Sequence, residues 1–402
     1  MPEISSRLQR LPPYFFAVIG QRMREMQAQN LDIIRLDIGN PDMPPPPHVL
    51  DAMQKAVFDP SKHGYSGYQG IPAFREAVAR YYQHRFGVSL NPDTEVLPLI
   101  GSKEGIVNMS LGYLDAGDIS LVPDVSYPSY ATGARLAGAE VHWLPMRAEN
   151  QYLVDVSDIP DQIAARAKVL WVNYPNNPTG ATANVDFYRD LVAFSIQNDI
   201  LLLSDNPYVE VTFDGYRASS ALSAPDAMTC TVEFMSFSKT FNMGGWRLGA
   251  AVGNAQALQT LLQVKSNVDS GHFHAIYDAG IAALDHTPRT WIDERNLIYQ
   301  RRRDRIMQTL PQIGLEAENP KGTLYIWARV KHGSAEEYIE QVLTQARVAL
   351  APGGAYGHGG EHYIRLSVSV PDDRLDEALT RLETWYTSNY KPSISTTQAN
   401  HV

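Results

Sequence analysis

Residues 231–253 read TVEFMSFSKTFNMGGWRLGAAVG and place one lysine between two apolar runs. The first run is typical of a buried strand, and the second, after a pair of glycines, indicates another core strand. A charged amine between core strands is costly unless the protein uses it, although most loop lysines are simply solvated. Ser236 and Ser238 precede Lys239, and Arg247 follows it. Desolvation and nearby cations favour a neutral lysine amine, so Lys239 is a candidate nucleophile.

The composition of the 402-residue chain, with 44% hydrophobic and 19% charged residues, is ordinary for a globular protein. A net charge of −10 argues against nucleic acid or an anionic membrane as the main partner. The single cysteine, Cys230, cannot build an intrachain disulfide framework and suggests no metal site. No signal peptide and no apolar stretch of about 18 residues is visible. We therefore expect a cytoplasmic protein with no metal and no membrane span.

Short apolar runs alternate with helical patterns along much of the chain. Strands are expected at 96–100, 119–122, 140–144, 168–173, 200–204 and 230–235, with helices between most of them. Such alternation predicts a mostly parallel sheet covered by helices. Beyond residue 311 the pattern changes to strands at 323–330, 348–351 and 363–370 with helices at 335–346 and 373–385, which predicts a smaller α+β domain. We expect an N-terminal arm and the start of the small domain at 1–45, the large domain at 46–280, the small domain at 281–390 and a disordered tail at 391–402.

Polar clusters at 101–105, 174–180, 205–208 and 236–239 follow directly after expected strands. Sites in parallel sheets gather in these loops, because the carboxyl ends of the strands meet at one edge. Ser102 and Lys103 begin a helix whose N–H groups favour an anion, or Ser102 is only a cap. Asp205 either caps a turn or faces a cation such as a protonated pyridine nitrogen. Tyr208 and Asn177 could bond a ring hydroxyl, although Asn-Pro pairs are usually turns.

Two arginines, Arg247 and Arg365, are candidate ligands for anions, because the planar guanidinium suits phosphate and carboxylate groups. Arg247 could bind a phosphate or pair with a surface carboxylate. Arg365 lies within an otherwise apolar strand, where it is either a residue at the surface edge or a bidentate clamp for a substrate α-carboxylate.

Together these residues resemble the class I aminotransferases, pyridoxal-phosphate enzymes of fold type I. The motifs that match are Tyr65 with Gly70, 101–103, Tyr127, 173–180, 205–208, 236–239 with Arg247, and Arg365. The resemblance extends over nearly the whole chain, and the SFSKT and GWRLG segments are its most specific part. It implies a large domain with a mostly parallel seven-stranded sheet covered by helices, together with a smaller α+β domain.

The resemblance also implies a role for each site residue. Lys239 is the catalytic lysine that forms a Schiff base with pyridoxal 5′-phosphate, Asp205 pairs with the pyridine nitrogen and Tyr127 stacks on the ring. The cofactor-binding set is Ser102, Lys103, Tyr127, Asn177, Asp205, Tyr208, Ser236, Ser238, Lys239 and Arg247, with Tyr65 supplied by the partner subunit of a homodimer that shares its active sites. The substrate-binding set is Arg365, Gly39, Asn177, Tyr14 and Glu104.

Within the family, the stretches 36–39, 81–88, 99–105 and 236–243 look like those of LL-diaminopimelate aminotransferases. This subgroup moves an amino group between LL-diaminopimelate and 2-oxoglutarate in lysine biosynthesis, and Glu104 would read the distal ammonium. The aspartate-specific relatives bring an arginine from the partner subunit, whereas residues 265–274 contain none. Lys265, Asn267 and His272 are candidate substitutes in that loop.

Three other functions stand beside this one. The chain could be a broad-specificity aspartate, alanine or aromatic aminotransferase, or a carbon–sulfur lyase of the same fold, because Lys239 and Asp205 would serve each chemistry. A regulator that binds the cofactor without turnover would carry an added basic DNA-binding domain. This chain is acidic and has only a short stretch before the expected cofactor domain, which disfavours the regulator.

Overall fold

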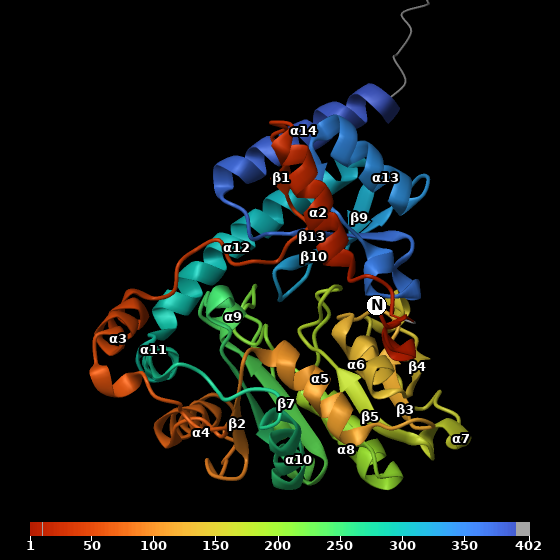
Figure 1. Ribbon diagram of the computed structural model, residues 1–402. Helices are drawn as coiled ribbons and strands as arrows, with labels where there is room; N and C mark the ends of the chain where they lie inside the picture. Colours follow the sequence, from red (N-terminus) through yellow and green to blue (C-terminus); the bar gives the residue numbers. More distant parts are fainter. Residues whose placement is uncertain (10, 391–402) are drawn as a thin grey trace, which may run out of the picture.

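The computed structural model describes residues 1–9 and 11–390, which form two bodies lying one above the other (Figure 1). The disordered tail expected at 391–402 lies outside the described residues. The α-helices are α1 (Ser6–Gln9), α2 (Phe15–Ala28), α3 (Pro47–Val57), α4 (Pro72–Phe86), α5 (Ser102–Tyr113), α6 (Ser129–Ala137), α7 (Asp161–Ala164), α8 (Val185–Asn198), α9 (Phe237–Thr240), α10 (Ala255–Lys265), α11 (His274–His286), α12 (Arg289–Thr309), α13 (Ala335–Gln341) and α14 (Asp372–Tyr390). The strands are β1 (Ile34–Arg35), β2 (Val96–Leu99), β3 (Ile119–Pro123), β4 (Glu140–Leu144), β5 (Ala167–Val172), β6 (Leu201–Asp205), β7 (Thr231–Ser236), β8 (Gly249–Gly253), β9 (Leu315–Ala317), β10 (Tyr325–Val330), β11 (Val348–Ala349), β12 (Ala351–Pro352) and β13 (Tyr363–Ser367).

The larger body is built on a seven-stranded sheet in the order β2-β8-β7-β6-β5-β3-β4. The strands from β7 to β4 in this order pair in parallel, and β8 runs antiparallel to both of its neighbours. Parallel strands that are buried on both faces need continuous apolar runs, and β5 and β6 have them. The sheet confirms the mostly parallel, seven-stranded arrangement that the sequence resemblance implied.

Two apolar cores cover the opposite faces of this sheet. Alternate side chains of β5 divide between them, because Val169 and Trp171 join one core while Leu170 and Val172 join the other. α5, α6 and α10 pack over the first face, and α4, α8 and α11 pack over the second (Figure 1). The helices leave the carboxyl edge of the sheet free to carry loops that meet the smaller body.

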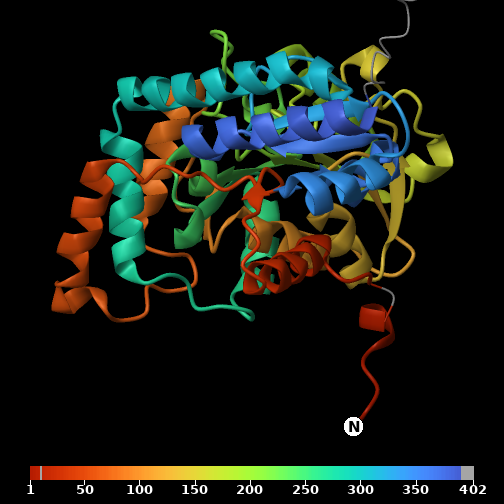
Figure 2. The ribbon, with the colours of Figure 1, turned by 90° about the horizontal axis from the view of Figure 1, so that it is seen from above.

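The smaller body holds a four-stranded antiparallel sheet in the order β12-β13-β10-β9 and has an apolar core of its own. α12 and α14 run side by side across it (Figure 2). This confirms the smaller α+β unit that the sequence predicts, whereas the domain boundaries named above stay a prediction. α12 begins beside the larger body and runs into the smaller one, so it connects the two (Figure 1).

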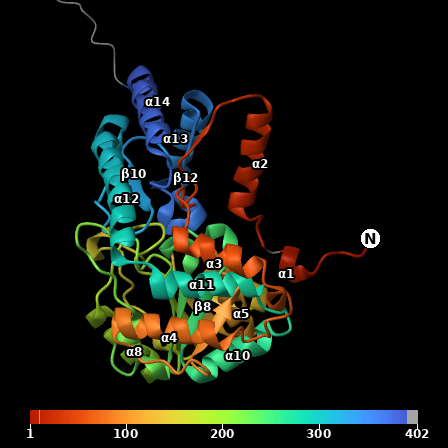
Figure 3. The same cartoon turned by 90° about the vertical axis from the view of Figure 1, so that its left-hand side faces the viewer.

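The N-terminal segment belongs spatially to the smaller body. β1 pairs in parallel with β11, and Met23 of α2 packs with Leu343 and Ala349. An exposed ion pair of 2.6 Å between Arg22 and Glu340 also joins α2 to α13. Figure 3 shows α2 at one side of the upper body. After β1 the chain passes between the two bodies before it reaches α3 in the larger one.

No helix in residues 1–9 and 11–390 is both long and apolar enough to cross a membrane. The same residues contain no group of three or more His, Cys, Asp or Glu side chains placed to hold a metal ion.

Candidate active site

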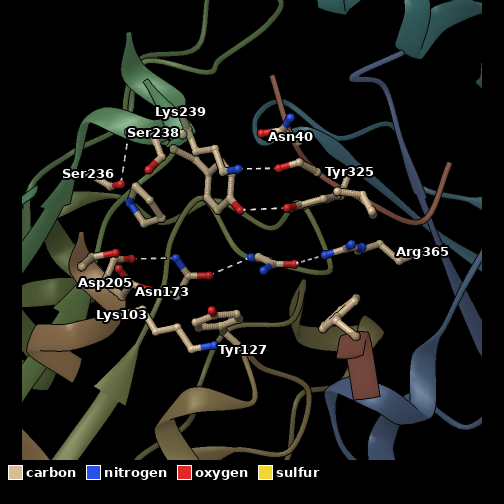
Figure 4. A pocket seen from close by; sticks show the side chains of 18 of the residues that line it. Asn40, Lys103, Tyr127, Asn173, Asp205, Ser236, Ser238, Lys239, Tyr325 and Arg365 are labelled. Atoms are coloured by element: carbon tan, nitrogen blue, oxygen red, sulfur yellow. Dashed lines mark hydrogen bonds between the residues drawn. The ribbon is translucent and has the colours of Figure 1, made fainter. Parts of the chain in front are cut away.

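A cavity of about 490 Å³ lies between the carboxyl edge of the large sheet, the N-terminal segment and the smaller body. Most of the site residues that the sequence predicts line it: Gly39, Ser102, Lys103, Tyr127, Asn177, Asp205, Tyr208, Ser236, Ser238, Lys239, Arg247 and Arg365. Figure 4 shows Lys239 and Arg365 reaching into this space from opposite sides, with Tyr127 at another wall. The fold thus gathers predicted site residues that lie up to 326 positions apart in the sequence, from Gly39 to Arg365.

The lysine turn is held by its own serines. Lys239 lies in α9, the four-residue helix that directly follows β7. The Ser236 hydroxyl accepts the Ser238 N–H at 3.3 Å and so caps this short helix. The Lys239 amine donates to the carbonyl oxygen of Gly39, and no carboxylate of the described residues forms an ion pair with it.

The cavity favours a neutral Lys239 amine. Burial is the main cause that lowers the pKa of Lys239, and the cations Arg365 and Arg247 lower it further, although Tyr325 opposes them. An amine with a lowered pKa can act as a nucleophile and as a general base near neutral pH. This is the environment that the apolar runs around Lys239 predicted.

Asp205 ends β6 with one satisfied and one unsatisfied oxygen. Its Oδ2 accepts the Tyr130 hydroxyl at 2.8 Å, whereas its buried Oδ1 has no hydrogen-bond partner among the described residues. Burial raises the pKa of Asp205 to about 7, and the bond from Tyr130 offsets part of this rise. A buried carboxylate with a free oxygen in a cavity is suited to a cationic group such as a protonated ring nitrogen.

A second part of the cavity is suited to an anion. The first N–H groups of a helix have no partner within the helix and favour an anion. Ser102 begins α5 and lines this part together with Lys103, and Arg247 lies against Gly101, the residue just before the helix. The contact requires glycine at position 101, where φ is +75° and a Cβ atom would lie 2.3 Å from Arg247 Nη2. Backbone N–H groups, serine hydroxyls and a guanidinium together form a donor set that suits a phosphate group.

Arg365 is buried, which excludes the interpretation that it is a residue at the surface edge. Its Nη1 donates to Asn177 Oδ1 at 2.9 Å and its Nη2 donates to the Asp37 carbonyl, while Nε has no partner among the described residues. Its Cζ lies 4.8 Å from the ring centroid of Tyr356 and 5.7 Å from that of Phe16. A buried guanidinium held by neutral groups inside a cavity is suited to a carboxylate ligand.

Three residues that the sequence resemblance assigned to the site do not line this cavity. Tyr65 lies before α4 and is 90% exposed. Tyr14 lies beside the cavity, with the Lys103 amine 4.1 Å from its ring centroid. Glu104 points away, accepting hydrogen bonds from Asn108 and from the Ile100 N–H. Their assigned roles stay predictions.

The polar side chains Lys265 and His272 of the loop 265–274 contact partners within the same chain. Lys265 is 1% exposed, and its amine donates to both carboxylate oxygens of Asp269, at 2.8 and 2.7 Å. Its nitrogen also lies 3.7 Å from a Glu104 oxygen. His272 Nε2 lies 2.7 Å from the Arg247 carbonyl oxygen. Neither these residues nor Asn267 lines the cavity of the single chain.

Several residues of the cavity had no role in the sequence prediction: Phe16, Asn40, Asn173, Tyr325 and Tyr356. Asn173 bonds the Asp205 carbonyl at 2.6 Å and accepts the Asn177 N–H at 2.7 Å, so it fixes two predicted residues. Its place directly after an apolar strand was the available signal. Phe16, Tyr325 and Tyr356 come from the N-terminal segment and the smaller body, where apolar positions look like ordinary core.

Another residue, Arg295 of α12, lies outside the cavity and holds the backbone next to it in place. This buried guanidinium donates to the carbonyl oxygens of Lys239 at 3.0 Å and Glu210 at 2.6 Å, and also to that of Thr240. Burial lowers the pKa of Arg295 to about 10. The helix that connects the two bodies therefore also fixes the backbone of the lysine turn.

Comparison with known proteins gives a consistent result. The family described as Aminotransferase class I and II matches residues 31–382. The LL-diaminopimelate aminotransferase of Dehalococcoides mccartyi (strain ATCC BAA-2266 / KCTC 15142 / 195) is 46% identical over 381 residues, which cover 94% of this chain and 98% of that protein. That of Moorella thermoacetica is 46% identical over 377 residues, covering 94% and 96%.

Solved structures agree with these sequence matches. Substrate-bound BacF from Bacillus subtilis superposes with a TM-score of 0.91 at 36% identity, covering 96% of this chain and 98% of that one. A single mutant of Thermus thermophilus aspartate aminotransferase gives a TM-score of 0.89 at 28% identity, covering 96% and 100%.

Proposed function

This chain belongs to the family of class I and II aminotransferases and is a transaminase, and on this premise we propose that its cavity holds pyridoxal 5′-phosphate and that it transfers an amino group between LL-diaminopimelate and 2-oxoglutarate. The observation that carries the proposal is the pairing, in one cavity, of a lysine and a buried carboxylate oxygen that both lack an oppositely charged or hydrogen-bonding side-chain partner within residues 1–9 and 11–390. Such buried, unmatched groups are costly in an empty protein and suit a ligand that completes them.

The donor set of the cavity fits each part of the proposed cofactor. Ser102, Ser236, Ser238 and Arg247, with the N–H groups at the start of α5, would hold the phosphate. Asp205 would hold the ring nitrogen, Asn177 and Tyr208 the ring oxygen, and Tyr127 one face of the ring. When bound, pyridoxal phosphate supplies an aldehyde carbon for amines and a protonated ring that withdraws electrons.

Lys239 is the residue that we propose moves the proton in catalysis. Its amine, once exchanged for that of the substrate, is free to take the proton from the substrate Cα and to deliver it to the neighbouring carbon. The Gly39 carbonyl is the group that orients the amine, and the lowered pKa of Lys239 supports its action as a base.

Arg365 is proposed to bind the α-carboxylate that all amino-acid and oxo-acid substrates share. A carboxylate would replace the neutral Asn177 and Asp37 partners of the guanidinium with a bidentate ionic bond. Phe16 and Tyr356 line the cavity beside Arg365 and exclude water from the pair. Replacing Arg365 by alanine should raise KM for every amino acid alike. A loss confined to one substrate would mean that Arg365 reads a side chain instead.

We further propose a homodimer in which Tyr65 of one subunit completes the site of the other. Large exposed apolar side chains support it: Tyr65 is 90% exposed, Phe58 79%, Val268 62% and Tyr68 51%. The Tyr65 loop lies against the 265–274 loop, because Ser66 Oγ donates to the His272 carbonyl at 2.8 Å. The two loops therefore form one surface that a second copy could cover.

Mixing two inactive variants tests the shared site. Tyr65→Ala and Lys239→Ala subunits, unfolded and refolded together, should form hybrid dimers in which one site has both native groups. Random pairing then restores about a quarter of the wild-type activity per site. No recovery, although sedimentation shows dimers, would mean that Tyr65 serves its own subunit or none.

The substrate pair is proposed from the relatives, which are named LL-diaminopimelate aminotransferases. The test is incubation of the protein with LL-diaminopimelate and 2-oxoglutarate and measurement of glutamate, beside a panel of aspartate, alanine and aromatic donors. Comparable rates with the panel would indicate broad specificity. Pyruvate and ammonia released from cystathionine, without glutamate formation, would indicate a carbon–sulfur lyase.

A further inference from the structure

Tyr130 of α6 donates a hydrogen bond to the carboxylate that is assigned to the ring nitrogen of the cofactor. Its hydroxyl oxygen lies 2.8 Å from Asp205 Oδ2, and both side chains are buried. The other carboxylate oxygen, Oδ1, has no hydrogen-bond partner among the described residues. Asp205 ends β6 and lines the cavity across from Arg365 (Figure 4). Tyr130 itself does not line the cavity, so it would act on a ligand through Asp205.

Neighbours on two sides fix the ring of Tyr130. It stacks on Trp171 of β5, with ring centroids 4.8 Å apart and planes at 8°. Tyr127 meets it edge-on, with centroids 5.9 Å apart, and the Tyr130 N–H donates to the Tyr127 carbonyl at 3.2 Å. A phenylalanine would fill the same apolar space, so packing explains the ring but not the hydroxyl. Among the described residues, Asp205 is the hydrogen-bond partner of that hydroxyl.

The bond from Tyr130 fixes the orientation of the carboxylate. The last side-chain torsion of an aspartate has broad minima, so a carboxylate without a fixed donor can turn. A donor on a rigid ring holds Oδ2 in place and thereby decides where Oδ1 lies. Asn173 adds a second constraint, because its side-chain amide donates to the main-chain carbonyl of Asp205 at 2.6 Å. Oδ1 is therefore presented to a ligand in one direction.

The same bond favours the charged form of Asp205. The titratable groups that face it are Tyr130 in α6, Tyr127 before that helix, Tyr208 after β6 and Glu233 in β7. Burial raises the pKa of each phenol, so Tyr130 keeps the proton that it donates. Burial raises the pKa of Asp205 to about 7, the Tyr130 bond opposes the rise, and Glu233 adds to it. A hydrogen bond to a charged acceptor changes an equilibrium about tenfold or more, so its loss should raise the pKa of Asp205 by about one pH unit.

We propose that Tyr130 is a positioning residue that presents the free oxygen of Asp205 to the cofactor ring and keeps this carboxyl group charged, an inference that rests on the proposed function. A charged Asp205 pairs with a protonated ring nitrogen, and a protonated ring is the form that withdraws electrons. Tyr127 and Tyr130 lie one turn apart, so a single short segment supplies the contact with the ring face and the support of the carboxylate.

The first test compares the affinity of the cofactor-free protein for pyridoxal 5′-phosphate in wild type and in Tyr130→Phe. The charged form of Asp205 is the one that binds the protonated ring nitrogen. A rise of its pKa from about 7 to about 8 should therefore weaken binding about ninefold at pH 6 and hardly at all at pH 9. The ratio of the two dissociation constants cancels the protonation of Lys239 and of the free cofactor, which both proteins share. A ratio that is equal at both pH values, or larger at pH 9, would overturn the proposal.

Tyr82→Phe is the matched control for this titration. Tyr82 is another buried tyrosine, and its hydroxyl donates to the buried carboxylate of Glu233 at 2.9 Å. Glu233 does not line the cavity. Tyr82→Phe should therefore reduce stability as Tyr130→Phe does, while the dissociation constant of the cofactor changes less than about twofold at either pH. A pH-dependent loss of affinity in both variants would mean that any lost bond to a buried carboxylate has this effect, and the proposal would fail.

The second test is a double-mutant cycle of Tyr130→Phe and Asp205→Asn on the cofactor-free protein, with unfolding measured at pH 5 and pH 9. The folded pKa of Asp205 lies above its unfolded value, so its contribution to stability is lost as the pH rises, and a higher folded pKa extends this loss. From pH 5 to pH 9 the unfolding equilibrium constant should rise about tenfold more in Tyr130→Phe than in wild type. In the Asp205→Asn background this difference should vanish, and a difference that persists there would overturn the proposal.

The two tests separate this proposal from the proposed function. Wild-type protein that binds no pyridoxal 5′-phosphate would refute the proposed function, and the unfolding cycle would still decide whether Tyr130 acts on Asp205. If Tyr130→Phe fails to fold, 3-fluorotyrosine in place of Tyr130 keeps the ring and is a stronger donor, because fluorine makes the phenol more acidic. It should tighten cofactor binding at pH 6, and unchanged or weaker binding would overturn the proposal.

Discussion

Two lysines of this chain are withdrawn from bulk water and differ in their partners. Lys239 lines the cavity and donates to a carbonyl oxygen, with no carboxylate of the described residues beside it. Lys265 is 1% exposed and donates to both oxygens of Asp269, with Glu104 at 3.7 Å. Both lysines follow apolar runs, so burial alone does not distinguish a functional lysine from a structural one. The presence or absence of a carboxylate beside the amine distinguishes the two.

The difference has a physical basis. A carboxylate beside an ammonium compensates the cost of burying it, and the pair then acts as a structural link. A carbonyl oxygen orients the amine but supplies no full charge, so burial can lower the pKa of Lys239. Asp205 shows the same feature with the opposite charge, because one of its oxygens is buried without a partner among the described residues. We interpret these unmatched groups as the ones that a ligand completes.

The largest expected effect is that of Lys239→Ala. The variant should lose at least about 10³-fold in kcat for transamination, because it removes both the nucleophile and the general base. Wild-type protein should be yellow, and borohydride should attach the cofactor to Lys239, as peptide mass spectrometry can show. Lys265→Met is the control, and it should still form the reducible adduct. A covalent adduct in Lys239→Ala would refute the assignment.

The second effect concerns stability. Lys265→Met leaves Asp269 and Glu104 with no cation between them, and we expect it to lower the free energy of unfolding by about 3 kcal/mol. Urea unfolding of the folded variant measures the loss. The double variant Lys265→Met/Asp269→Asn should recover part of it, because it removes one of the two unpaired carboxylates. Unchanged stability would mean that the ion pair contributes nothing, and the comparison of the two lysines would fail.

The half of the site that we propose holds the cofactor could be predicted from the sequence, because it depends on local order. β5, β6 and β7 are buried on both faces, so their apolar runs mark where each strand ends. The polar residues at or shortly after these strand ends, including Asn177, Asp205 and Lys239, therefore had to lie on one edge of the sheet. The structure places all three in the cavity.

The other half could not be predicted, because it depends on register and on contacts between bodies. Tyr325 enters the cavity through the pairing of β10 with β13, which no local pattern reveals. The expected strand 348–351 is in fact divided, since Val348 and Ala349 pair with β1 while Ala351 and Pro352 pair with β13. Glu104 follows a strand as Ser102 does, yet its carboxylate turns toward Asn108.

The third effect depends on pH, and here the substitution should raise the free energy of unfolding, whereas Lys265→Met should lower it. Asp205 has a folded pKa of about 7 against an ordinary value of 3.8, so its contribution to stability is fully present below pH 4 and is lost as the pH rises through 7. Asp205→Asn should therefore stabilise the cofactor-free protein at pH 8 by about 2 kcal/mol, and the gain should vanish near pH 4. Unfolding of the cofactor-free protein at several pH values measures it.

Glu233 provides the matched control for Asp205. It is also a buried carboxylate, but it accepts hydrogen bonds from Ser220 Oγ, the Ala221 N–H and the Tyr82 hydroxyl at 2.8 to 2.9 Å. Burial raises the pKa of Glu233 too, but these hydrogen bonds oppose the rise. Glu233→Gln should destabilise the protein at pH 8 by about 1–3 kcal/mol, because the amide cannot accept all of these bonds. A stabilising effect of both substitutions would show that burial, rather than a missing partner, sets the sign.

The smallest expected effect is that of Glu104→Gln, which removes one of the two carboxylates beside Lys265. Its carboxylate bonds the Ile100 N–H at 3.1 Å and lies 3.7 Å from the Lys265 amine. Because both contacts lie within the chain, we expect their loss to lower the free energy of unfolding by about 1 kcal/mol, and a purely structural role of Glu104 would leave the ratio of kcat/KM for LL-diaminopimelate over glutamate unchanged. Glu104→Asp, which keeps the charge, is the control for the length of the side chain. A ratio that falls in Glu104→Gln, with stability retained, would instead support the reading of the distal ammonium by Glu104.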